Sequence, residues 1–129
     1  MSSAPIKKRK LYDRLEEVSG YRIMDMKKFS AALLEIHVCK DGYLQIMEDT
    51  DAQKGLCCKF YLVCSKCLTG VPFRSSSLVA HDRSYDVNHR MTTAAAKIGI
   101  GRQSLTDLCY MMNMPGAPPV TESNCSTQP

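Results

Sequence analysis

The feature that most constrains the fold is a pair of cysteines separated by two residues, Cys64 and Cys67, at the end of an apolar stretch. Residues 56–64 are rich in apolar, β-prone side chains, with Lys59 the one charge, and this pattern predicts a strand. A strand that ends in Cys-x-x-Cys is typical of a zinc knuckle, because two thiolates three positions apart can hold one metal ion. The tight turn also directs backbone N–H groups at the sulfurs. The sequence therefore predicts a structural zinc site at this turn.

A closed zinc site needs four ligands, and the chain has no second Cys-x-x-Cys. We predict His37 and Cys39 as the other two ligands, because they end a predicted helix and could face the knuckle. Further candidates are other histidines and thiols: Cys57, Cys58, His81, His89 and Cys109. Cys57 and Cys58 lie on the predicted strand, where cysteine commonly serves as a small buried hydrophobe. Buried free thiols are the alternative interpretation of the whole set.

The cysteines are expected to be reduced. The first ten residues lack the apolar segment of a secretory signal, so the seven cysteines are predicted to be thiols or metal ligands rather than a disulfide framework. No apolar run approaches about 18 residues, so no membrane partner is expected. With 129 residues, 44% hydrophobic and 23% charged, the chain suits one globular domain.

Apolar spacing predicts an α+β fold. Helical spacing covers residues 11–18, about 26–40, 87–98 and 102–113. Strand-like segments cover 43–48, 56–64 and 71–74, and the acidic residues 48–55 predict a turn or longer loop. We expect a small antiparallel β-sheet with a zinc knuckle, flanked by helices and a C-terminal helix-turn-helix-like pair. The expected boundaries are a basic flexible tail and short helix at 1–19, the domain at 20–114, and a Pro-rich disordered tail at 115–129.

The last two predicted helices resemble a DNA-reading pair. Ala95 is small enough for two helices to cross closely, and Gly99 allows the chain to reverse. Arginine and glutamine at the start of a second helix are residue types that read guanine and adenine edges. We therefore predict DNA contacts at the end of the first helix and the start of the second: Lys97, Arg102, Gln103 and Ser104. The alternative is a plain helical hairpin in which Arg102 is merely solvated.

The N-terminal tail carries the net charge. Lys7, Lys8, Arg9 and Lys10 occur among the first ten residues without an acid, and the rest of the chain is neutral overall. Such a cluster is typical of a nuclear-import signal, so a nuclear location is expected; the alternative is a solubilising tail. Residues 54–102 hold 8 basic and 2 acidic groups, which favours an anionic partner such as DNA.

The sequence contains no recognisable catalytic frame. No carboxylate pair stands in a catalytic pattern, and there is no phosphate-binding loop. His37 and Cys39 are too close in sequence to form an ordinary nucleophile and base on a helix. We therefore expect a chain that is not itself an enzyme.

Three ordered blocks resemble one family. They are residues 20–25 with 37–42, residues 48–56 with 64–67, and residues 85–90 with 98–105 and 109–115. Their order and spacing resemble the N-terminal part of the Mutator-like transposase domain of animal mobile elements, over roughly residues 20–119. His89 stands where the family pattern has an arginine, and the second proline of the last block is delayed to Pro118.

The resemblance implies a transposon-derived protein tied to DNA transposition. Full-length members carry a downstream RNase-H-like core, whose acidic residues and divalent metal cut and join strands. No residue of this chain matches those carboxylates, so we expect a truncated, non-catalytic fragment. We expect this fragment to contact DNA or partner transposase subunits in a nuclear complex, and those partners include further copies of the same chain. The alternative is a small structural zinc-binding adaptor without nucleic-acid binding.

Overall fold

The computed structural model describes residues 11–79 and 84–116. The predicted import tail, Lys7 to Lys10, lies outside these residues, as does His81. The described chain forms two compact units. We call residues 11–19, 24–52 and 59–75 the sheet unit, and residues 20–23, 53–58, 76–79 and 84–116 the helical unit. None of the helices in the described ranges is long and apolar enough to cross a membrane.

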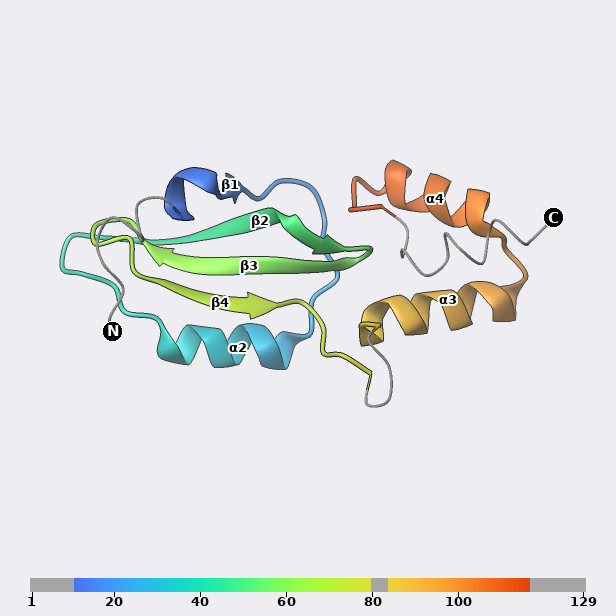
Figure 1. Ribbon diagram of the computed structural model, residues 1–129, viewed down its shortest axis with the longest axis horizontal. Helices are drawn as coiled ribbons and strands as arrows, with labels where there is room; N and C mark the ends of the chain where they lie inside the picture. Colours follow the sequence, from blue (N-terminus) through green and yellow to red (C-terminus); the bar gives the residue numbers. More distant parts are fainter. Residues whose placement is uncertain (1–10, 80–83, 117–129) are drawn as a thin grey trace. The chain divides into compact units, whose positions relative to one another are not determined.

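A four-stranded sheet carries the candidate site (Figure 1). The strands lie in the order β1-β2-β3-β4, and their bounds are Glu16–Glu17, Leu44–Lys54, Cys57–Cys64 and Gly70–Arg74. β1 pairs antiparallel with β2, and β4 pairs antiparallel with β3. A two-residue turn joins β2 to β3, with Gly55 at φ 61°, a conformation that glycine adopts without strain. The predicted α+β class and small antiparallel sheet are confirmed.

β2 is longer than the sequence predicts. The acidic residues from Glu48 onward were expected to form a loop, but the strand continues to Lys54. Glu48 and Asp49 are buried, and the Arg14 guanidinium lies 2.8 Å from the Asp49 carboxylate. Because this cation comes from a helical turn 35 residues earlier, the carboxylate can be buried within a strand. Residues 11–17 therefore join the sheet unit by a helical turn and by β1.

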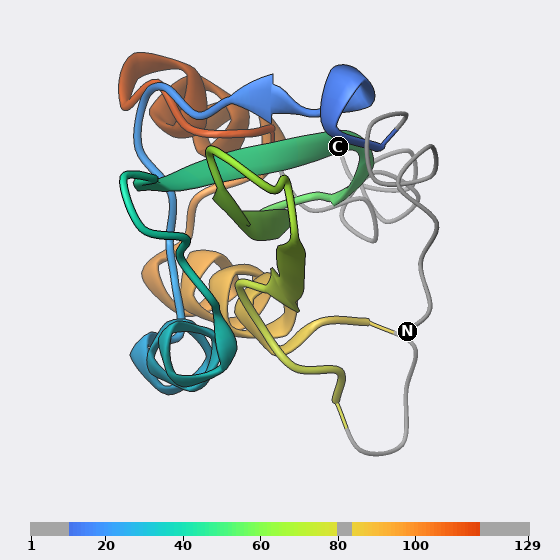
Figure 2. The same cartoon turned by 90° about the vertical axis from the view of Figure 1, so that its left-hand side faces the viewer.

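The sheet unit has apolar side chains on both faces of the sheet. On one face Leu15, Met47, Tyr61 and Val63 form a buried cluster. On the other, α2 (Met26–Glu35) runs alongside β4 (Figures 1 and 2). There the Phe73 ring lies 5.8 Å from the ring of Phe29 on α2 and 5.5 Å from that of Phe60 on β3. These ring contacts hold the first half of α2 against the sheet.

α2 begins where the sequence predicts and ends earlier. The Asp25 carboxylate accepts the backbone N–H of Lys27 at 3.0 Å, which caps the helix as expected. The helix ends at Glu35 rather than near residue 40, and Ile36 is extended. The prediction that His37 and Cys39 end the helix is therefore wrong. The backbone N–H of Cys39 instead donates to the Cys64 sulfur at 3.2 Å, a contact that a helical Cys39 would not make.

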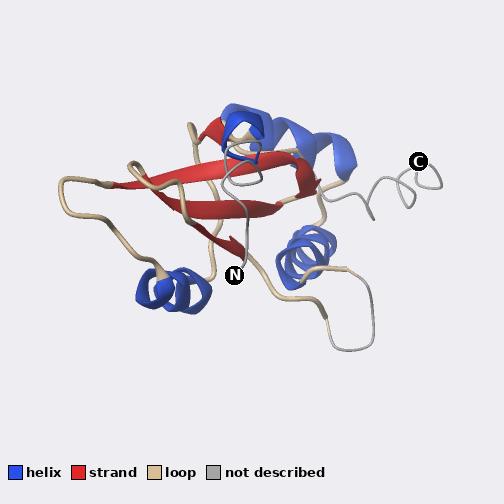
Figure 3. Cartoon of the chain, turned by 60° about the vertical axis from the view of Figure 1, so that its left-hand side comes forward, coloured by secondary structure: helices blue, strands red, loops and turns tan. Residues whose placement is uncertain are grey.

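The helical unit contains α3 (Asp86–Ile98) and α4 (Arg102–Met111), joined by three residues with Gly99 at φ 82° (Figure 3). Ala95, Leu105 and Cys109 pack together with Leu56 in its core. Both helices and the glycine break match the sequence prediction closely. The DNA-reading role of this pair stays a prediction.

Asn88 is a structural residue that the sequence analysis did not identify. Its side chain is buried on α3, where its Oδ1 accepts the backbone N–H of Leu56 at 2.8 Å. Its Nδ2 donates to the Lys54 carbonyl at 2.9 Å. Asn88 therefore holds both sides of the turn between β2 and β3 against α3, which explains an asparagine at this position.

Candidate metal centre

Two turns of the sheet unit meet at the candidate site. One runs from the end of α2 to the start of β2, and the other joins β3 to β4. The backbone N–H of Tyr43 donates to Ser65 Oγ at 2.9 Å, and the backbone N–H of Ser65 donates to the Tyr43 carbonyl at 2.9 Å. These reciprocal bonds fix the two turns to each other. They bring together side chains that lie about 25 residues apart in the chain.

Three ligand-type side chains converge there. His37, Cys39 and Cys67 each offer a ligand atom, and these atoms all lie within 4.8 Å of one another. The His37 Nε2 atom lies 3.3 Å from the Cys39 sulfur. Zinc holds sulfur at about 2.3 Å and nitrogen at about 2.0 Å, so ligand atoms around it lie about 3.5 Å apart. The observed grouping is therefore compact enough for one ion.

Cys64 adjoins this group and has the electrostatics of a thiolate. The backbone N–H groups of Cys39, Cys67 and Lys66 lower the pKa of the Cys64 thiol to about 6. Close by, the hydrogen bond with Cys67, burial and the nearby Cys64 raise the pKa of the Cys39 thiol to about 11. Three sulfurs this close cannot all ionise without a cation among them. A divalent soft-metal ion would supply that cation, so the donor set fits zinc.

A side chain at Gly42 would be crowded by both turns. A Cβ there would lie 3.1 Å from the Cys39 carbonyl oxygen and 3.2 Å from the Cys64 sulfur. The sequence analysis did not identify this role, since Asp41-Gly42 appeared only as a helix stop. Leu68, at φ 60°, closes the second turn with a bond from its N–H to the Cys64 carbonyl at 2.9 Å. Its side chain packs on the core cluster around Met47, which anchors the turn.

The structure groups three of the four residues that the sequence favoured, His37, Cys39 and Cys67. The fourth, Cys64, lies outside that three-residue group, and its sulfur accepts the backbone N–H of Cys39. The other described candidates lie elsewhere. Cys57, Cys58 and Cys109 are buried, and His89 is exposed on α3. A Cys₃His set would fill a tetrahedral zinc shell, as in structural sites, and leave no open position for substrate. Metal binding by these residues stays a prediction.

The predicted DNA contacts lie in the helical unit. Lys97, Gln103 and Ser104 are exposed, and the Gln103 amide donates to Asp107 at 2.9 Å. No acidic residue or side-chain cap occupies the first turn of α4, whose free N–H groups favour an anion.

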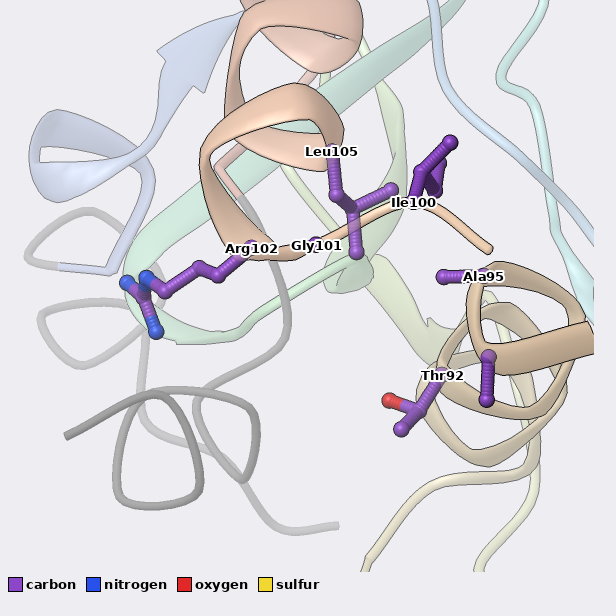
Figure 4. A pocket seen from close by; sticks show the side chains of 7 residues that line it. Thr92, Ala95, Ile100, Gly101, Arg102 and Leu105 are labelled. Atoms are coloured by element: carbon purple, nitrogen blue, oxygen red, sulfur yellow. The ribbon is translucent and has the colours of Figure 1, made fainter. Parts of the chain in front are cut away.

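Arg102 differs from these three residues because its guanidinium is partly enclosed. Its Nη1 atom is buried, and no acceptor for it occurs within the part of the chain that the structure describes. A pocket of about 70 Å³ adjoins Arg102, Thr92 and Leu105. In Figure 4 the guanidinium extends away from Thr92 and Leu105. Contact between Arg102 and a base edge stays a prediction.

The fold and the cluster define an α+β protein whose His and Cys side chains could hold a metal ion. A family model described as Mutator-like transposase matches residues 20–128, which confirms the resemblance of the three sequence blocks. The chain belongs to the Mutator-like transposase family and has a transposon-derived origin. No curated protein and no solved structure matches it.

Proposed function

We propose that this chain is a non-catalytic, DNA-contacting part of a Mutator-like transposase that acts in a nuclear complex with DNA and with transposase subunits or further copies of itself. The observation that carries the proposal is the family match over residues 20–128. Two features of the described residues support it. The thiol cluster can stabilise the sheet unit by holding zinc, and α4 presents Gln103 and Ser104 at an N-terminus without an acidic residue.

Strand cleavage is not part of this proposal. Cleavage of the RNase-H type needs carboxylates that hold a metal pair. Within residues 11–79 and 84–116, the three-ligand group comprises His37, Cys39 and Cys67, with no carboxylate. We expect the pure protein to leave supercoiled plasmid intact with magnesium or manganese, and reproducible nicking that one carboxylate substitution abolishes would contradict this.

Binding of duplex DNA tests the α4 surface. Lys97→Ala should weaken binding to all DNA sequences alike. It should also reduce the slope of log affinity against log salt by about 0.9, because one phosphate contact is lost. Arg102→Ala should cost about 1–3 kcal/mol of specific binding and relax one base position. Fluorescence anisotropy against duplexes selected from a random pool measures both effects. Lys54→Ala, another exposed lysine of the helical unit, is the control.

A structural adaptor without DNA binding is the second candidate function. The buried Nη1 atom of Arg102 favours it, because an enclosed guanidinium would not read a base. If Lys97→Ala and Arg102→Ala both bind duplex DNA as the parent protein does, the two helices are scaffold. A parent protein that binds no duplex DNA favours the adaptor function.

A further inference from the structure

Cys39 and Cys67 differ from the other cysteines in the described part of the chain because solvent reaches them. Both are half-buried, and their sulfur atoms lie within 4.8 Å of each other. The buried thiols are Cys57, Cys58, Cys64 and Cys109. A small oxidant in water can reach the half-buried pair, whereas the surrounding protein shields the buried thiols. Access and proximity together single out Cys39 and Cys67 as a pair that can be oxidised jointly.

The backbone around both sulfurs allows them to close the remaining distance. A disulfide has a sulfur–sulfur distance of about 2 Å, so these two sulfurs need to approach by about 3 Å at most. Cys39 follows the end of α2, and Cys67 lies in the turn after β3, so neither is held in a helix or strand. A rotamer change about a Cα–Cβ bond moves a sulfur by roughly 3 Å. Side-chain rotation in the two turns therefore suffices, and the sheet need not rearrange.

Cys64 is the third sulfur of the centre, and its surroundings protect it. It is 0% exposed, and its sulfur accepts the backbone N–H of Cys39 at 3.2 Å. Separation along the chain favours Cys64 instead, because it is much nearer to Cys67 than Cys39 is and a short loop costs less entropy to close. The folded structure and the bare sequence therefore predict different disulfide partners for Cys67.

We propose that Cys39 and Cys67 form a reversible disulfide when hydrogen peroxide oxidises this centre, and that this disulfide and the predicted zinc ion exclude each other. Peroxide transfers one oxygen atom to the first thiol, which becomes a sulfenic acid, and one water is released. The second sulfur then attacks the sulfenic sulfur, so that the S–S bond forms as the S–O bond breaks. The hydroxyl group leaves as a second water with the proton of the attacking thiol. The two sulfurs lose two electrons in total, and peroxide gains them.

The exclusion of zinc follows from the loss of thiolate ligands. Zinc binds thiolate sulfur, whereas a disulfide sulfur carries no negative charge and is a poor zinc ligand. The disulfide would remove two members of the group His37, Cys39 and Cys67, so a bound ion would be released. When the reaction starts from two zinc-bound thiolates, the two waters take up two protons from the buffer. This inference goes beyond the proposed function and does not depend on DNA binding.

Tryptic peptide mapping reads the disulfide pairing directly. Cleavage after lysine and arginine yields the peptides 29–40, 60–66 and 67–74, which contain Cys39, Cys64 and Cys67 in that order. The full chain with its zinc is titrated with hydrogen peroxide, the remaining thiols are blocked with N-ethylmaleimide, and the digest is analysed by mass spectrometry. We expect the main cross-link to join 29–40 to 67–74 and to disappear after treatment with dithiothreitol. Zinc released into a chromogenic chelator should rise in proportion to this cross-link.

Unfolding the chain provides the matched control. In urea with chelator the proximity of Cys39 and Cys67 is lost, and loop closure favours the link between Cys64 and Cys67. The ratio of the 29–40 to 67–74 link over the 60–66 to 67–74 link should therefore fall by about fivefold or more. Cys57→Ala removes a buried thiol outside the cluster and should leave the map of the folded chain unchanged.

Two results for the folded parent chain would overturn the disulfide. The first is a main cross-link between 60–66 and 67–74, and the second is oxidation of Cys39 or Cys67 to sulfinic acid without any cross-link. Equal zinc content in the cross-linked and the reduced chain would contradict the exclusion of zinc. The result is separable from that of the proposed function, because the Lys97 and Arg102 variants test DNA binding on the helical unit and both cysteines lie in the sheet unit.

Discussion

Cys64→Ser is expected to abolish zinc binding and cooperative folding of the sheet unit. Serine would replace a thiolate with a poor zinc ligand at the position that accepts N–H bonds from Cys39, Cys67 and Lys66. Structural zinc sites contribute about 10–16 kcal/mol of apparent binding free energy, which is comparable with or larger than the about 5–15 kcal/mol net stability of ordinary domains. Zinc content by atomic emission and thermal unfolding by circular dichroism, with and without chelator, measure the effect.

Cys57→Ala is the matched control. It also removes a buried thiol, but this cysteine lies at the start of β3 and outside the ligand cluster. We expect it to keep about one zinc per chain and to unfold cooperatively. Three results together would contradict the structural zinc site. The parent protein would contain no zinc, all of its thiols would be titratable, and it would melt at the same temperature with and without chelator.

Leu105→Ala is expected to destabilise the helical unit by about 2–5 kcal/mol. Leu105 is 1% exposed and packs with Ala95, Cys109 and Leu56, so alanine would leave a cavity or force the helices to repack. Urea unfolding followed by circular dichroism measures the loss. The zinc content should not change, because all four predicted ligands lie in the sheet unit.

Leu108→Ala on the same helix provides the comparison. Leu108 is 45% exposed, so its truncation removes little buried surface and should cost well under half as much as Leu105→Ala. Equal losses for the two variants would show that α4 does not pack through Leu105. That result would contradict the described core of the helical unit.

Local patterns predicted much of the secondary structure. α3 and α4 follow from apolar spacing and the glycine break at 99, and β3 follows from its continuous apolar, β-prone run. The start of α2 follows from the Asp25 cap. These features depend on residues within one or two turns of each other, so the sequence alone contains the information.

The wrong boundaries share a physical cause in distant contacts. β2 continues through acidic residues because Arg14 pairs with Asp49, and α2 ends early because Cys39 bonds to Cys64. Asn88 satisfies the backbone of the hairpin turn from another element, and a side chain at Gly42 would be crowded because a sulfur and a carbonyl approach that position. The residues within a few positions of each of these sites do not predict the distant contact that it makes.

The predicted metal ligands also differ in whether local sequence or tertiary contacts identify them. The sequence by itself determined the Cys64–Cys67 pair and its turn, because both ligands belong to one short segment. It offered His37 and Cys39 only among several candidates. The tertiary structure grouped three of the described candidates, since the bonds between Tyr43 and Ser65 hold the turn after α2 against the turn after β3. Ligand distances across 25 residues of chain are a property of that packing, which no local pattern encodes.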